Sequence, residues 1–192
     1  MKILALCGSL RSGSLNSAVL RSAGELFAAP WEFTLQDDLG KLPFFNADVE
    51  QNALPEIVSE FRARLGDSDG LLISTPEYAH GTSGVLKNAL EWLVGGGEIA
   101  GKPVALMSAS PAITGGNRAQ AWVGETLTVM GADVLPDGLK IPQATRKVTN
   151  GRLTDEPTLA AVRELLDRLA RAVDEARRYR EEENEVLGKA SM

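Results

Sequence analysis

A Gly- and Ser-rich segment near the amino terminus combines residue types that bind phosphate. An apolar run at residues 3–6 is followed, after a glycine, by the hydroxyls of Ser9, Ser12 and Ser14 and the guanidinium of Arg11. Helical periodicity begins just beyond. A turn between a buried strand and a helix presents free N–H groups, to which hydroxyls and an Arg add donors for a dianion. We predict that this loop binds a phosphate, although a Ser-rich turn that merely caps a helix has a similar pattern.

Two better-known phosphate loops do not fit the sequence. A dinucleotide fingerprint requires G-x-G-x-x-G, and here Ser9 and Leu10 follow Gly8, so the second and third glycines are missing. The nearest match to a Walker A loop, residues 96–102, is followed by Pro103 where Ser or Thr would have to ligate magnesium. The remaining loop relies on hydroxyls and one Arg, which suits a terminal monophosphate such as that of FMN.

Composition indicates a globular protein without disulfides. The 192 residues are 44% hydrophobic and include one cysteine, Cys7, so the chain can bury a sizeable core but cannot form a disulfide framework. Cys7 ends the first expected strand, where a packing role and a redox role both remain open. The net charge of −6 argues against nucleic acid. We expect a cytoplasmic protein with no signal peptide, no membrane span and no metal.

Strand-like and helix-like segments alternate along the chain. This alternation predicts an α/β fold, a flavodoxin-like five-stranded parallel sheet with helices on both faces, although the strand order cannot be read. The expected strands are 2–8, 31–35, 70–74, 104–108 and 132–135, and the expected helices are 15–28, 54–65, 84–93, 117–130 and one from about 155. The irregular stretch 37–54 is long, and such loops are more often functional than idle.

Three loops of unusual composition should meet at one edge of this sheet. They are residues 8–16, 75–84 and 108–118, which follow the first, third and fourth expected strands. Ligands of such sheets bind beyond the carboxyl ends of the strands. The second and third loops combine glycines with few charges, which suits a flat aromatic ligand. Each loop alone could be an ordinary turn, but three at the same edge predict a site.

The motifs in these loops resemble those of the NADPH-dependent FMN reductase family, which includes quinone, azo-dye and chromate reductases. The resemblance extends from Lys2 to about Ile141 and is specific to the family, not to a substrate. The motifs that carry it are Gly8-Ser9-Leu10-Arg11 with Ser14 and Asn16, Pro76-Glu77-Tyr78, residues 84–92, Gly115-Gly116 and Arg118-Ala119-Gln120.

The resemblance implies FMN as cofactor and assigns site residues. By this resemblance, the FMN phosphate would be held by Ser9, Arg11, Ser14, Leu15 and Asn16. The isoalloxazine would be lined by Pro76, Glu77, Tyr78 and the backbone that follows at Ala79, His80 and Gly81, with the third loop closing the site at Ser110 and Gly115.

Three segments depart from the commoner family pattern. Ala79 stands where many members have Asn, and Ser83 stands where many have Pro. Residues 121–124 also lack the His-Leu-Arg that is common in relatives. The acceptor preference of relatives therefore cannot be carried over.

The implied activity is that of an FMN-dependent oxidoreductase. A hydride would pass from NADPH or NADH to the flavin, and two electrons would then pass to a quinone-like, azo or other small acceptor, with the protein fixing stacking and polarity. No residue is assigned a certain catalytic role. His80 is either a group that stabilises charge at the ring or a solvated side chain, and Glu77 is either a proton donor or a cap that orients its loop. The alternatives are a flavin reductase that supplies a monooxygenase and a non-catalytic flavodoxin-like electron carrier.

The sequence also leads to expectations about domain organisation and assembly. We expect one FMN-binding domain over residues 1–180 and a charged tail at 181–192, either disordered or an interaction arm. Trp92 is expected in the core or at a subunit interface. The resemblance implies a homodimer or homotetramer, because the helix at 84–93 takes part in a dimer in relatives.

Overall fold

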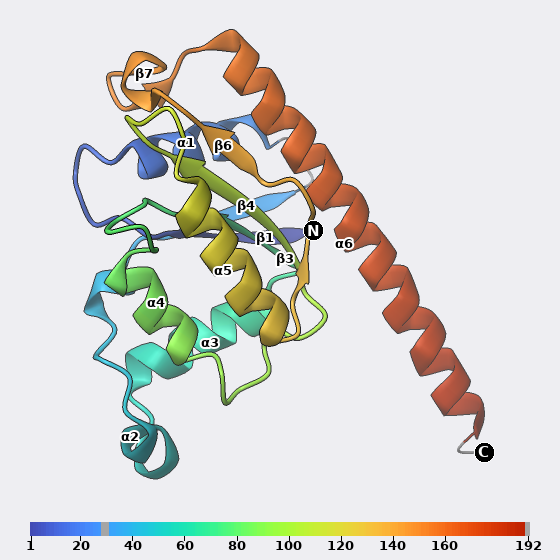
Figure 1. The fold of residues 1–192 in the computed structure, drawn as a ribbon. Coiled ribbons are helices and arrows are strands. Elements are labelled where there is room, and N and C mark those ends of the chain that lie inside the picture. Colours follow the sequence, from blue (N-terminus) through green and yellow to red (C-terminus); the bar gives the residue numbers. More distant parts are fainter. Residues whose placement is uncertain (28–30, 191–192) are drawn as a thin grey trace.

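The computed structural model describes residues 1–27 and 31–190 and consists of a twisted parallel sheet covered by helices on both faces (Figure 1). The strands of the sheet are β1 (Lys2–Cys7), β2 (Glu32–Gln36), β3 (Gly70–Ser74), β4 (Pro103–Ala109), β5 (Asp133–Val134) and β6 (Leu139–Ile141). The helices are α1 (Leu15–Leu26), α2 (Ala47–Asn52), α3 (Glu56–Asp67), α4 (Gly84–Glu91), α5 (Asn117–Val129) and α6 (Glu156–Ala190). Short elements are the 3-10 turns η1 (Leu39–Lys41) and η2 (Ala144–Arg146) and the hairpin β7 (Val148–Thr149) and β8 (Arg152–Leu153).

The strand order is β2-β1-β3-β4-β5, with every neighbouring pair parallel. This is the doubly wound order of flavodoxin-like proteins, so the predicted fold class is confirmed. Every residue of β3 and β4 is buried, which explains why both strands appear in the sequence as continuous apolar runs. No helix in the described part of the chain is long and apolar enough to cross a bilayer.

The fifth position of the sheet differs from the single strand predicted at 132–135. It is filled by two short segments, β5 beside the start of β4 and β6 beside its end. Pro136 lies between them, and Asp137 has a φ of 53°. A proline lacks the N–H that a sheet ladder needs, and a positive φ cannot continue a strand. The ladder therefore stops after Val134 and resumes at Leu139, with four residues between the two segments.

Two apolar layers hold the helices to the sheet. Helices α3, α4 and α5 cover one face, whose core includes Phe61, Leu71 and Trp92. Helices α1 and α6 cover the other, where Val19 and Leu169 pack on the strands. Trp92 is fully buried, so it belongs to the core, one of the two places expected for it.

Helix α6 is longer than the sequence suggests. The charged tail at 181–192 was expected to be either disordered or an interaction arm, and in the structure the helix continues through Ala190 and projects beyond the sheet (Figure 1). The segment contains few apolar residues to bury, yet four of its residues are Glu, and it also contains Leu, Lys and Ala, all of which are strong helix formers. Arg177 also forms a bidentate pair with Asp69, at 3.1 and 2.7 Å, which ties α6 to the start of β3.

Candidate functional site

The structure brings the three predicted loops together at the carboxyl edge of the sheet. Residues 8–14 follow β1, residues 75–83 follow β3 and residues 110–116 follow β4. The amide of Gly8 donates to Ser74 O at 2.9 Å, and the amide of Thr75 donates to Met107 O at 3.0 Å. A Cβ on Gly8 would lie 2.9 Å from the ring of Pro76, so the first two loops approach closely only because this position is glycine.

The loop after β1 leaves a set of hydrogen-bond donors without protein acceptors. Ser14 caps α1, and its Oγ accepts from Ser17 N at 3.1 Å. Among the described residues, no acceptor is bonded to the amides of 9–13 or to those of Leu15 and Asn16. The hydroxyls of Ser9 and Ser12 and the Arg11 guanidinium likewise donate to no described protein atom. Amides at a helix start with nearby hydroxyls and one cation match the acceptor oxygens of a phosphate, so this donor set fits the terminal phosphate of FMN.

Asn16 has a structural task in addition to any contact with a ligand. Its side chain is buried and donates from Nδ2 to Ala109 O at 3.0 Å. Its Oδ1 accepts from Ala109 N at 2.9 Å and from Ser74 Oγ at 2.8 Å. One side chain thereby joins the start of α1 to the ends of β3 and β4. Leu15 beside it is partly buried and packs against the core under α1, so only its amide is available to a phosphate.

Glu77 links the second loop to the third. Helix α5 begins after Gly116, which has no side chain to cap it. The Glu77 carboxylate supplies the cap, because Oε2 accepts from Arg118 N at 3.0 Å and from Ala119 N at 3.3 Å. A carboxylate at a helix amino terminus also interacts favourably with the helix dipole. Of the two roles open to Glu77 from the sequence, the geometry shows the cap.

Residues 78–81 form a tight two-residue hairpin. The amides of Tyr78 and Gly81 donate to each other's carbonyls at 3.0 and 2.9 Å. Ala79 and His80 between them have φ values of 49° and 64°, as a type I′ turn requires. Neither residue is a glycine, so the turn carries backbone strain, and such strain clusters at ligand sites. The ring of Tyr78 is half exposed at the tip.

The third loop is shaped by two glycines and two serines. Gly115 and Gly116 have φ values of 64° and 83°, and a Cβ on Gly116 would lie 3.0 Å from Ser108 Cβ. Ser108 is buried at the end of β4 and donates to Gly115 O at 2.7 Å. Ser110 Oγ accepts from Ala112 N at 3.1 Å. Ser110 and Gly115 themselves lie beside residues 140–144, since Ser110 N donates to Ile141 O at 3.1 Å and a Cβ on Gly115 would lie 3.1 Å from Ile141 N.

The structure also identifies supporting residues that the sequence analysis missed. Ser108 and Ser74 lie at the ends of two buried strands, where a hydroxyl must find a partner. Thr75 is fully buried, and its Oγ1 lies 2.6 Å from Thr82 Oγ1, which closes the second loop. In the sequence, these supporting residues could have been found as hydroxyl residues that interrupt or end a buried apolar run.

The titratable side chains near the loops are few. The side chain of His80 is 72% exposed, and its Nδ1 lies 3.5 Å from Glu77 Oε1. Cys7 is buried, with Sγ 3.0 Å from Ser17 Oγ. Neither group forms an acid–base pair of the kind that hydrolases use. The arrangement suits a site in which the protein binds and orients a redox cofactor.

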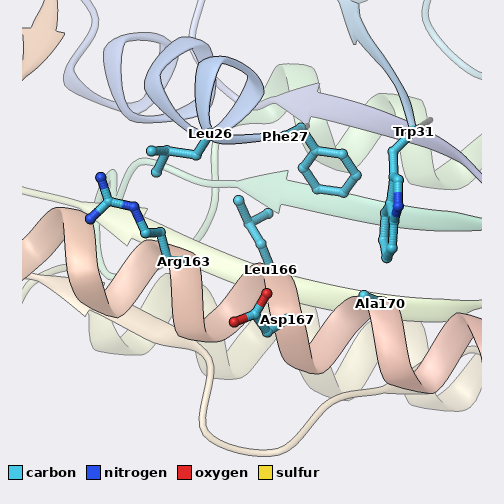
Figure 2. A pocket seen from close by; sticks show the side chains of 7 residues that line it. All are labelled: Leu26, Phe27, Trp31, Arg163, Leu166, Asp167 and Ala170. Carbon is cyan, nitrogen blue, oxygen red and sulfur yellow. The ribbon is translucent and has the colours of Figure 1, made fainter. Parts of the chain in front are cut away.

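A separate hollow lies at the opposite edge of the sheet, between the end of α1 and α6 (Figure 2). It has a volume of about 270 Å³, and Phe27 and Trp31 meet there edge to face with ring centroids 5.2 Å apart. Arg163 and Asp167 reach it from α6. It is remote from all three loops, because α1 runs from the carboxyl edge of the sheet to the amino edge. The hollow is therefore not part of the candidate site.

Comparison with known proteins agrees with the fold and identifies the family. The family model for NADPH-dependent FMN reductase matches residues 1–146. An NAD(P)H-dependent FMN reductase of Pseudomonas aeruginosa is 35% identical over 88% of this chain and 93% of its own. A quinone reductase of Escherichia coli is 33% identical over 70% of this chain and 73% of its own. The structure of a flavoenzyme NAD(P)H:(acceptor) oxidoreductase of Paracoccus denitrificans superposes with a TM-score of 0.81 at 31% identity, covering 91% of this chain and 98% of that one.

The flavodoxin-like sheet and the three loops at its carboxyl edge define a class of nucleotide-binding α/β proteins. Within it, this chain belongs to the NADPH-dependent FMN reductase family. The family consists of flavin-dependent NAD(P)H oxidoreductases, so the predictions of the family, the enzyme class and the cofactors FMN and NAD(P)H are confirmed.

Proposed function

We propose that this protein reduces quinone-like acceptors, using FMN held at the three loops and NAD(P)H as the reductant. The observation that carries the proposal is the set of donors in the loop after β1, namely the amides of residues 9–13, 15 and 16, which have no acceptor among the described residues. This set matches a phosphate and lies beside two glycine-containing loops. Quinone reductases among the relatives support the acceptor class. When it is bound, FMN supplies the redox chemistry. The protein's own residues have to bind and orient it.

The roles of the individual residues follow from their positions. Ser9, Arg11 and the amides at the start of α1 would hold the FMN phosphate, while Ser14 and Asn16 keep these amides in place. Pro76 and the hairpin at 78–81 would line the ring from one side. Residues 110–115 would line it from the other side, and the Glu77 cap fixes the distance between these two loops.

We extend the proposal to a homodimer. A groove of about 560 Å³ lies between α4 and α5, and Lys87, Trp122 and Met130 contribute to its lining. At its rim, the side chains of Val94 and Val129 are 67% and 85% exposed. A second copy of the chain would cover this surface. Sedimentation velocity would show a dimer for the wild type and a monomer for Val129→Asp, because a buried unpaired charge opposes association.

We further propose a single FMN-binding domain and a cytoplasmic location. Residues 1–180 would form one FMN-binding domain, since all three loops and both apolar layers lie within them. A cytoplasmic location fits a chain whose one cysteine, Cys7, is a free thiol.

The test is quinone-dependent oxidation of NADPH by the purified, FMN-loaded protein. We expect rapid oxidation with 1,4-benzoquinone and slow oxidation without it. FMN should remain with the protein through gel filtration. If FMN instead separates on the column and free FMN is consumed as a substrate, the protein is a flavin reductase. If FMN is retained but NADPH does not reduce it, an electron carrier is the correct class.

A further inference from the structure

Gln120 is the polar member of the buried face of α5. It is 5% exposed, and its buried neighbours on this helix are Ala119, Val123 and Leu127. The proposed function assigns it no role, although it belongs to the sequence motif at residues 118–120. An apolar side chain would fill this position at a lower desolvation cost, so the presence of an amide has to be explained by the groups that it contacts.

The amide of Gln120 contacts the two segments that hold the third loop. Its Nε2 donates to Leu139 O of β6 at 3.0 Å and lies 3.4 Å from Ser108 Oγ at the end of β4. Because a backbone carbonyl can only accept, Leu139 O requires the nitrogen of the amide on this side. The Ser108 hydroxyl therefore faces a donor, and it gives its own hydrogen to Gly115 O at 2.7 Å. In this way Gln120 sets the direction of the Ser108 hydrogen bond.

The Gln120 side chain reaches β6 where the edge of the sheet is broken. Strand β4 pairs with β5 up to Val104 and with β6 from Met107, so the ladder at this edge skips residues 105–106. The chain enters β6 through Gly138, and a Cβ there would lie 3.1 Å from Gln120 Cδ. Strand β6 has three residues. A hydrogen bond from a buried side chain is therefore a substantial part of what holds this strand in place.

Both contacts of Gln120 act on the third loop. The end of β6 and the residues after it form the wall behind this loop, since Ser110 N donates to Ile141 O at 3.1 Å and Ala144 N donates to Ser110 O at 2.9 Å. The Ser108 hydrogen bond joins the start of the loop to its end at Gly115. A shift of β6 or a rotation of the Ser108 hydroxyl would therefore move the residues that are proposed to line the flavin ring.

We infer that Gln120 is a positioning residue, which sets the affinity of the site for the isoalloxazine ring by holding the third loop from beneath. The inference rests on the proposed function, because it takes the third loop as one wall of the flavin site. Gln120 acts through Ser108 and Leu139 and does not contact the flavin itself. A loop that is already ordered binds its ligand without the entropy loss of ordering it. Loss of the amide should therefore weaken binding of the ring and leave the phosphate contacts unchanged.

The first experiment compares FMN with riboflavin, which has the ring but no phosphate. Quenching of flavin fluorescence gives both Kd values for the wild type and for Gln120→Met, a variant of similar length that cannot donate a hydrogen bond. We expect both flavins to bind roughly three- to tenfold more weakly to the variant, the equivalent of about one neutral hydrogen bond. Unchanged affinities, or a loss for FMN alone, would overturn the inference.

Ser22→Ala is the matched control for a general loss of stability. Ser22 is buried in the middle of α1, and its Oγ accepts from Leu153 N at 3.0 Å. The substitution removes a partner from a buried backbone group, as Gln120→Met does, but away from the third loop. It should lower the melting temperature and leave both flavin affinities unchanged. Losses of affinity equal to those of Gln120→Met would overturn the inference.

The second experiment uses Gln120→Glu, for a readout that packing alone would not change. Glutamate has the shape of glutamine, and its carboxyl can donate to Leu139 O only while it is protonated. Burial raises the pKa of such a carboxyl. Riboflavin should therefore bind more tightly to Gln120→Glu than to Gln120→Met at low pH, and this advantage should be lost as the pH rises through that pKa. Equal affinities of the two variants at every pH at which they are folded would overturn the inference.

Failure of the inference is distinguishable from failure of the proposed function. A wild-type protein that binds neither flavin would contradict the proposed function, and that result is visible before any variant is compared. A wild-type protein that binds both flavins, with a Gln120→Met variant that binds them equally well, would overturn the inference alone.

Discussion

Asn16 and Ala109 exchange two hydrogen bonds across 93 residues of sequence, from Nδ2 to the carbonyl at 3.0 Å and from the amide to Oδ1 at 2.9 Å. Because Ser74 Oγ also donates to the same Oδ1, this one amide side chain holds the ends of β3 and β4 against the start of α1. The first of the three loops proposed to bind FMN ends at the start of α1, and the other two begin at the ends of β3 and β4. The clamp therefore sets both the stability of the edge and the shape of the site.

Asn16→Ala should destabilise the protein markedly. The substitution leaves the Ser74 hydroxyl and the backbone of Ala109 buried without partners, which costs about 3 kcal/mol. For a chain of this size, the melting temperature should fall by roughly 6–12 °C. Thermal unfolding followed by circular dichroism measures the shift. Ser12→Ala, at an exposed position of the same loop, is the control and should change the melting temperature little. An unchanged melting temperature for Asn16→Ala would show that the clamp contributes nothing.

Arg11→Ala should weaken FMN binding and leave riboflavin binding unchanged, because riboflavin has no phosphate. Loss of a charge-assisted contact of about 1.5–3 kcal/mol corresponds to roughly tenfold to a hundredfold in Kd. Quenching of flavin fluorescence measures both constants. Arg21→Ala is the matched control, since it removes the same charge nearby and should leave FMN binding intact. Equal losses for FMN and riboflavin would contradict the assignment of the phosphate loop.

Ala79→Asn should stabilise the hairpin at 78–81. Ala79 has a φ of 49°, where an L side chain other than Asn or Gly costs about 1 kcal/mol, so the melting temperature should rise by roughly 2–4 °C. FMN affinity should change no more than several-fold, because the backbone keeps its conformation. The matched control is Ala121→Asn, at an exposed helical position, which should destabilise slightly. A large gain in FMN affinity would show that Ala79 impairs the natural site.

His80→Ala should reduce NADPH oxidation only a few-fold, and Cys7→Ser should leave it nearly intact. The side chain of His80 is 72% exposed, and Cys7 is buried against Ser17, so neither is placed as an essential proton donor. A general acid contributes about a hundredfold or more. Steady-state kinetics with a quinone acceptor measures both variants. A hundredfold loss in His80→Ala would make it a catalytic residue, and an inactive but folded Cys7→Ser would point to thiol chemistry.

The sequence was sufficient to predict the sheet and the edge at which the site lies. Strands β3 and β4 are buried on both faces, so each leaves a continuous apolar run, and the loops after them are unusual in composition. The division of the fifth strand into two parts could not be predicted from the sequence. Its pieces contain two and three residues, and they are strands only because β4 lies beside them.

Side-chain roles in the site were harder to predict than its position. Asn16 was expected to hold the FMN phosphate, but its clamp depends on partners 58 and 93 residues away, which no local pattern reveals. The sequence left two roles open for Glu77, because the helix that it caps, α5, begins after a different loop.

The most direct test of the central claim is the visible spectrum of the purified protein, recorded with oxygen excluded, before and after NADPH is added. The account predicts the absorption bands of bound oxidised FMN at the start and their rapid loss after NADPH is added, with the bands restored by a quinone. A protein that carries no flavin and binds none when FMN is supplied, or one whose bound FMN stays oxidised in excess NADPH, would contradict it.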